Sequence, residues 1–148
     1  MSERQMTDGA AILARNIAAV NARDIEGYLA NQHPDIEFVL PGGVVLHGRD
    51  EVRRATEALW TAFPDGHLLF GDQVVSGDTA ATEVVFTGTH TGPLVTPVGE
   101  LPPTRRRVQT RSASMLRFRD GMVIAEHVYS DQLDMMTQLG LGPGGTAS

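Results

Sequence analysis

The 148-residue sequence predicts one α+β domain in which helices cover one face of a curved, mostly antiparallel sheet. The length suits a single hydrophobic core. Helical periodicity is concentrated before residue 64, whereas residues 67–129 consist of extended runs separated by turn signals. We expect the domain to span residues 1–141. Residues 142–148 lack large apolar side chains, which predicts a flexible tail.

Two helices are predicted at the start of the chain. Apolar residues at spacing i, i+4 and i+7 predict an amphipathic helix over residues 7–22. Asp24 is placed to cap a short second helix, which contains Tyr28 and ends near Asn31. These helices should form a hairpin.

A strand and a third helix follow. Phe38 lies in an alternating segment that predicts a strand over residues 36–40, with a short return strand over residues 44–46. Helical spacing that includes Trp60 and Phe63 predicts a helix from residue 50 to the residue before Pro64.

The rest of the domain is predicted to be extended chain and one final helix. The extended runs cover residues 68–70, 74–75, 82–91, 108–118 and 123–129. Asp120-Gly121 predicts a type I′ turn that makes the last two strands antiparallel neighbours, with Arg119 opposite Met122. A short helix over residues 132–139 would be closed by Gly140.

The turn also predicts which side chains of this hairpin share a face. Regular pairing from Arg119 and Met122 puts ten residues on one face: Thr110, Ser112, Ser114, Leu116, Phe118, Val123, Ala125, His127, Tyr129 and Asp131. The opposite face carries Gln109, Arg111, Arg117 and Arg119, whose guanidinium groups need solvent, so the first face should point inward. The inward face changes from apolar to polar along its length, as expected of a pocket with a reactive mouth.

Each polar candidate also has a structural interpretation. Asp131 stands where a strand meets a helix and could serve as the N-cap of that helix. His127 could be a hydrogen-bonded core histidine, and Tyr129 could pack with its hydroxyl on Ser112. Trp60 and Phe63 could be core residues or pocket wall.

Composition excludes several classes of function. There is no cysteine or lysine, which excludes thiolate ligands, thiolate nucleophiles and lysine Schiff bases. The net charge of −6 argues against nucleic-acid and membrane partners. No apolar run has the length of a signal peptide or a membrane span, so a cytoplasmic protein is expected. No histidine cluster or glycine-rich phosphate loop is present, so neither a metal nor a nucleotide cofactor is predicted.

Several runs in the second half of the chain resemble the SnoaL-like polyketide cyclase family. They are Phe86-Thr87-Gly88-Thr89-His90-Thr91-Gly92-Pro93-Leu94, Leu101-Pro102-Pro103-Thr104, Phe118-Arg119-Asp120-Gly121, Val128-Tyr129-Ser130-Asp131-Gln132-Leu133 and Gln138-Leu139-Gly140-Leu141. The resemblance implies an NTF2-like fold, a curved sheet wrapped by helices into a cone. It also implies catalysis without cofactor or metal, a homodimer or homotetramer, and Asp131 as the acid/base.

The activity implied by the resemblance is an intramolecular aldol closure of a polyketide-like small molecule. Asp131 would remove a proton from a carbon flanked by carbonyls, and His127, Tyr129 or water would donate to the developing oxyanion. We expect the substrate to contact a set of inward side chains: Tyr28, Phe38, Trp60, Phe63, Phe86, Ser112 and Ser114. Two alternatives stay open: an isomerase or epoxide hydrolase using the same pocket, and a non-catalytic module that binds a small ligand or dimerises.

Overall fold

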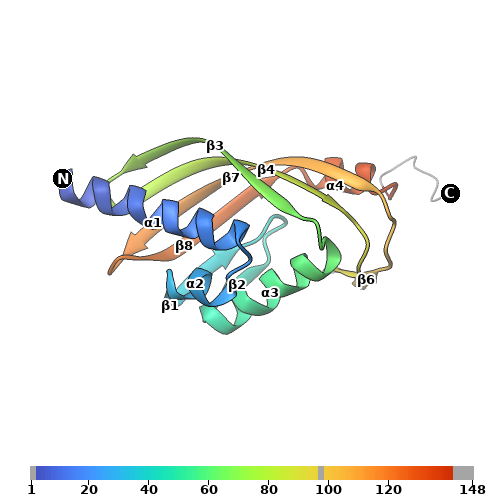
Figure 1. Ribbon diagram of the computed structural model, residues 1–148, viewed down its shortest axis with the longest axis horizontal. Helices are drawn as coiled ribbons and strands as arrows, with labels where there is room; N and C mark the ends of the chain where they lie inside the picture. Colours follow the sequence, from blue (N-terminus) through green and yellow to red (C-terminus); the bar gives the residue numbers. More distant parts are fainter. Residues whose placement is uncertain (1–2, 97–98, 142–148) are drawn as a thin grey trace.

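A curved six-stranded sheet is the centre of the structure, a computed structural model that describes residues 3–96 and 99–141 (Figure 1). The helices are α1 (Glu3–Asn21), α2 (Ile25–Ala30), α3 (Gly48–Ala62) and α4 (Gln132–Gln138). The strands are β1 (Gln32–Val39), β2 (Val45–His47), β3 (His67–Ser76), β4 (Thr79–Thr89), β5 (Leu94–Thr96), β6 (Gly99–Leu101), β7 (Arg107–Arg119) and β8 (Met122–Ser130). The predicted tail at residues 142–148 lies outside the described residues.

The strands of the main sheet follow the order β2-β1-β8-β7-β4-β3. Each neighbouring pair is antiparallel except β1 and β8, which run parallel. The sheet arches over α1, α2 and α3, which all lie on its concave side (Figure 1). The predicted α+β class, with helices on one face of a curved and mostly antiparallel sheet, is therefore confirmed.

Element boundaries differ from the prediction in three places. β1 begins at Gln32, four residues before the predicted start, and so includes Pro34. Proline is tolerated there because this part of β1 is irregular, with a register shift between Gln32 and Glu37. The runs at residues 68–70 and 74–75 form one strand, β3, interrupted by a bulge. The small β5–β6 hairpin was not predicted.

The apolar interior consists of two separate clusters. The first joins α1, α2 and α3 to one end of the sheet, and its members include Leu13, Leu29, Val52, Leu116 and Phe118. The second lies at the other end, where Ala62, Phe63, Val108 and Leu139 pack together. Between the clusters, the inner face of the sheet carries the buried polar side chains of Thr82, Thr110, Ser114 and Glu126.

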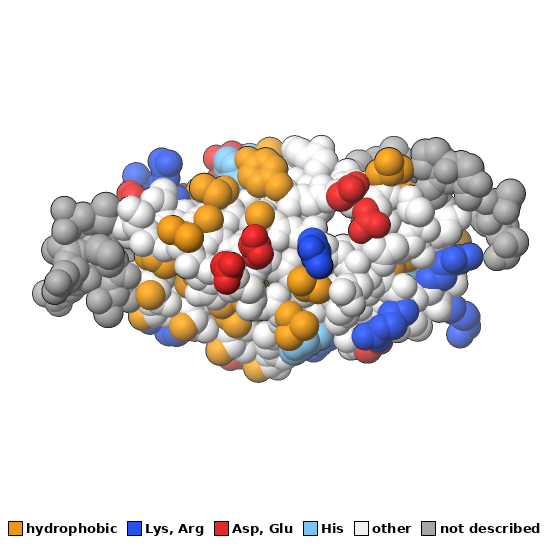
Figure 2. All heavy atoms as spheres, turned by 90° about the horizontal axis from the view of Figure 1, so that it is seen from above, with side chains coloured by type: hydrophobic (Ala, Val, Ile, Leu, Met, Phe, Trp, Pro, Cys, Tyr) orange, Lys and Arg blue, Asp and Glu red, His pale blue; other side chains and the backbone are white. Residues whose placement is uncertain are grey.

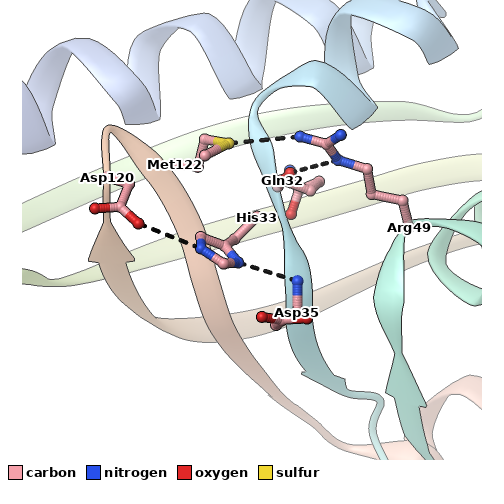
Figure 3. A network of polar contacts seen from close by, with 6 residues as sticks. All are labelled: Gln32, His33, Asp35, Arg49, Asp120 and Met122. Atoms are coloured by element: carbon pink, nitrogen blue, oxygen red, sulfur yellow. Dashed lines mark hydrogen bonds and ion pairs between the residues drawn. The ribbon is translucent and has the colours of Figure 1, made fainter.

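Polar contacts tie the first end of the fold together (Figure 3). The Arg49 Nε, at the start of α3, donates to the Gln32 carbonyl at 2.7 Å, while its Nη2 lies 3.5 Å from the Met122 sulfur on β8. His33 Nε2 lies 3.4 Å from the Asp120 carboxylate in the β7–β8 turn, and its Nδ1 accepts from the Asp35 backbone. Three segments distant in sequence are thereby held at one end of the sheet.

No described helix is long and apolar enough to cross a membrane.

Candidate active site on the inner face of the sheet

The turn between β7 and β8 forms as its residue types predict. Asp120 and Gly121 both have positive φ, at 55° and 75°, and Arg119 pairs with Met122. Phe118 then pairs with Val123, again as predicted. The next pair, however, joins Arg117 to Ala125. Ile124 is therefore an extra residue in β8, a β-bulge that the regular register did not include.

The bulge reverses the predicted faces of β8 beyond Ile124. His127 and Tyr129 were predicted to point inward, and this prediction is wrong. His127 pairs with the outward Met115, and the Tyr129 side chain is 61% exposed. Glu126, which pairs with the buried Leu116, points inward instead. One extra residue produces this change because side chains alternate between faces with a period of two.

The inner face of β7 agrees with the prediction. Ser114 is buried and Ser112 is half-buried, and both lie on the same face as Leu116 and Phe118. Thr110 is also buried on this face. The arginines of β7 lie between them in sequence and are exposed on the outer face, as solvation of guanidinium groups requires.

Glu126 is the buried carboxyl group of this region. Its side chain is 9% exposed, and its Oε1 atom is shielded from solvent without a hydrogen-bond partner among the described residues. Burial raises the pKa of Glu126 to about 7, and a hydrogen bond with the Ser114 side chain opposes the rise. This carboxyl can therefore both accept and release a proton near neutral pH.

Tyr28 of α2 faces the same region. It is 6% exposed, and its burial together with the nearby charge of Glu126 raises its pKa well above the usual value, against a hydrogen bond with Thr56. The phenol therefore stays protonated at any pH at which the protein functions. Tyr28 and Thr56 bring a protonated phenol and a hydroxyl from α2 and α3 toward the carboxyl on β8.

Asp131 caps α4, which confirms the structural alternative. Its side chain accepts from the Asp134 backbone N–H at 3.0 Å, and the residue is exposed. The carboxylate is thus occupied at the surface rather than desolvated inside the cone. Its assignment as the acid/base stays a prediction that no contact in the structure supports.

The predicted aromatic contacts lie in three separate places. Phe38 pairs with Glu126 across β1 and β8, so the two side chains share the inner face. Phe63 and Phe86 meet edge to face in the second apolar cluster, with ring centroids 5.1 Å apart. Trp60 is half-buried with the Arg23 guanidinium 5.4 Å from its ring centre, and this pair joins the end of α3 to the end of α1.

No pattern in the sequence indicates the inward position of Glu126. Ile124 is apolar and β-branched, so it suits either face of a strand. With regular pairing, Glu126 would stand beside the arginines of the solvent face, where an acidic side chain is unremarkable. Only the observed register identifies it as buried.

Two other features of the described residues make weaker sites. Among residues 3–96 and 99–141, no group of three or more His, Asp or Glu side chains could hold a metal ion. A surface groove of about 310 Å³ lies between α2 and α3, lined by Glu26, Leu29, Ala30, Arg49, Asp50 and Arg53. Its charged groups already pair across it, with Arg53 Nη2 2.8 Å from Glu26 Oε1. The inner face around Glu126 is therefore the stronger candidate.

The fold and its family can be compared with known proteins. The family model for the SnoaL-like polyketide cyclase matches residues 10–139. The chain therefore belongs to the SnoaL-like polyketide cyclase family. Among curated proteins, none matches this chain.

Solved structures agree with this membership. A candidate SnoaL-like polyketide cyclase from Jannaschia sp. CCS1 superposes with a TM-score of 0.84 at 19% identity, over 97% of this chain and 99% of that one. IdmH, a candidate polyketide cyclase from Streptomyces antibioticus, gives a TM-score of 0.74 at 29% identity, over 89% and 98% of the two chains. AclR, a candidate hydroxylase from Streptomyces galilaeus, gives 0.78 at 27% identity, over 93% and 88%. The first of these shows shared fold alone.

Proposed function

We propose that this protein is an acid/base enzyme that closes a ring in a neutral polyketide-like molecule by intramolecular aldol addition, with Glu126 as the proton-transferring group. Glu126 takes the role that the family resemblance implies for Asp131, because Asp131 is exposed and serves as a helix cap. The family membership supports the type of reaction. The relative IdmH, named as a candidate polyketide cyclase, supports it further.

The reaction requires one group that accepts and then returns a proton. The Glu126 carboxylate removes a proton from a carbon flanked by two carbonyls, which leaves an enolate. The enolate carbon forms a bond with a second carbonyl carbon of the same molecule, and the π electrons of that carbonyl move onto its oxygen. The protonated Glu126 then delivers the proton to this alkoxide, which restores the carboxylate and leaves a β-hydroxy ketone. No electrons enter or leave.

Tyr28 fits the second role in this chemistry. A neutral phenol that stays protonated can donate a hydrogen bond to the enolate or alkoxide oxygen without losing its proton. The inward Tyr28 thus replaces the outward Tyr129 as the proposed oxyanion donor.

One observation carries the proposal: a carboxyl oxygen of Glu126 is buried without a partner, and burial raises its pKa to about 7. A carboxyl at its ordinary pKa is a weak base, whereas one near neutral pH combines useful basicity with a substantial ionised fraction. An isolated buried carboxyl is also unfavourable for folding, so its presence suggests a function.

The test compares Glu126→Gln with Asp131→Asn on a panel of neutral linear polyketones that can cyclise. Glutamine keeps the size of the side chain but cannot transfer a proton, so turnover should fall by on the order of a hundredfold or more. Asparagine keeps the cap of α4, so Asp131→Asn should retain wild-type turnover. Cyclised product is measured by liquid chromatography, and melting temperatures show whether both variants are folded.

The opposite pattern would return the acid/base role to Asp131. Retained turnover in both variants would remove acid/base catalysis by either carboxyl. Epoxides and β,γ-unsaturated ketones belong in the same panel, since the same carboxyl could activate water or shuttle a proton. Turnover of one of these, with no cyclisation, would replace the aldol proposal with hydrolysis or isomerisation.

A further inference from the structure

The inner face of β7 has an unusual order of residue types. Its inward positions are Val108, Thr110, Ser112, Ser114, Leu116 and Phe118. Val108 belongs to the second apolar cluster, and Leu116 and Phe118 belong to the first. Three consecutive inward positions between the clusters therefore carry hydroxyls, where a buried strand would ordinarily carry Val or Ile.

These hydroxyls are not explained by contacts within the protein. Ser114 hydrogen-bonds with Glu126. Thr110 and Ser112 have no side-chain hydrogen-bond partner among the described residues, and neither oxygen is among those fully shielded from solvent. Because their oxygens keep some contact with solvent, Thr110 and Ser112 can exchange a hydrogen bond with water for one with a bound ligand.

Part of the same region keeps contact with solvent, and among its described inward residues Glu126 is the one with a carboxyl group. Ser112, Phe86 and Val128 point inward yet are only half-buried. The inward residues of β4 here are Thr82, Val84 and Phe86, and none is ionisable. Glu126 is the ionisable side chain on this part of the sheet, so an anionic molecule would be repelled from it.

We propose that Thr110 and Ser112 select the substrate by hydrogen-bonding to neutral oxygens remote from the reacting carbon. Residues two apart on a strand are about 7 Å apart, so the two hydroxyls and Ser114 form a row about 13 Å long that leads away from Glu126. The molecule that fits is uncharged and carries carbonyl or hydroxyl oxygens along one edge. This inference deepens the proposed function and rests on it for the position of the reacting carbon.

Binding measurements test this selection without requiring turnover. The probes are 1,8-dihydroxyanthraquinone, which has three oxygens along one edge and no charge, and 1,8-dihydroxyanthraquinone-3-sulfonate, which has the same three oxygens and one negative charge. Wild-type protein should bind the first in preference to the second. The variant Thr110→Val with Ser112→Ala keeps the side-chain volume but should weaken binding of the dihydroxy compound about tenfold, as the loss of two hydrogen bonds implies.

Two controls make the outcome specific. Thr87→Val removes a hydroxyl from β4 on the other face, opposite Gln109, and should leave affinity unchanged. In the presence of Glu126→Gln, the Thr110→Val and Ser112→Ala substitutions should still weaken binding of the dihydroxy compound. Unchanged affinity in the Thr110/Ser112 variant, no binding of the dihydroxy compound to wild type, or tighter binding of the sulfonate would each overturn the inference. Turnover retained by Glu126→Gln, with the hydroxyl effect present, would instead overturn only the role of Glu126.

Discussion

Glu126 shows how far the environment of one residue can change its chemistry. A glutamate in water titrates near 4.5, but burial raises the pKa of Glu126 to about 7. Ser114 offers one hydrogen bond, and no cation is among the groups that shift this pKa. Burial therefore disfavours the charged form of this carboxyl. A pKa near neutral pH is the property that proton transfer at neutral pH requires.

The pKa of Glu126 predicts how stability depends on pH. Below pH 4.5 the carboxyl is protonated in both folded and unfolded chains, so it contributes no penalty. Between pH 4.5 and about 7 the unfolded chain loses this proton while the folded protein keeps it, and above 7 the folded protein carries the charge buried. The unfolding free energy should therefore fall with rising pH, by about 3 kcal/mol for this group.

Urea denaturation of wild type and Glu126→Gln between pH 4.5 and 8 measures this effect. The difference between their unfolding free energies should change with pH in favour of the glutamine variant. The comparison cancels the contributions of the other titrating groups, which both proteins share. A difference that is constant across this range would show that Glu126 is ionised at its ordinary pKa in the folded state.

At the scale of elements, the sequence predicts much of the fold correctly. It assigns the wrong faces to one strand, β8. The helices, the Asp120-Gly121 turn and the inner face of β7 all follow from local residue types and spacing. The faces of β8 depend on Ile124, whose bulge is set by how β8 fits between β7 and its parallel neighbour β1. That fit involves residues far apart in sequence, so local patterns predicted His127 inward where the structure has Glu126.

Asp131 has a well-defined local role as the N-cap of the short helix α4. Asp131 accepts from the Asp134 backbone, and α4 is joined to β7 by two hydrogen bonds between the Gln138 side chain and the Gln109 backbone. Asp131→Ala should lower the unfolding free energy by about 1 kcal/mol, whereas Asp131→Asn should change it little. Thermal or urea denaturation measures both. Equal losses in the two variants would show that the negative charge, not the cap, stabilises α4.

At the scale of the whole molecule, the outer face of the sheet carries a largely apolar row beside the exposed arginines of β7. One row crosses all six strands, with Val45, Val39, His127, Met115, Ala81 and Val74 in register from β2 to β3. Met115 is 50% exposed and Val74 is 66% exposed. Figure 2 shows hydrophobic side chains grouped on this side, with charged ones of both signs between them.

We propose that a second copy of the chain covers this face. Six strands span about 25 Å, and a face of this width can supply the roughly 800 Å² per partner of a standard interface. Met115→Asp should convert a dimer to a monomer in sedimentation experiments, with an unchanged circular dichroism spectrum. Leu133→Asp, at an exposed apolar position on α4, is the matched control. A wild-type monomer, or a dimer in Met115→Asp, would remove this proposal.

Direct titration of Glu126 tests the central claim most simply. Carboxyl ¹³C resonances are followed by NMR from pH 3 to 9, and the signal of Glu126 is assigned by its absence from Glu126→Gln. An inward, desolvated carboxyl predicts a midpoint near 7 for that signal. A midpoint near the ordinary value of 4.5 would contradict the account, because Glu126 would then be a solvated side chain with no advantage as an acid/base.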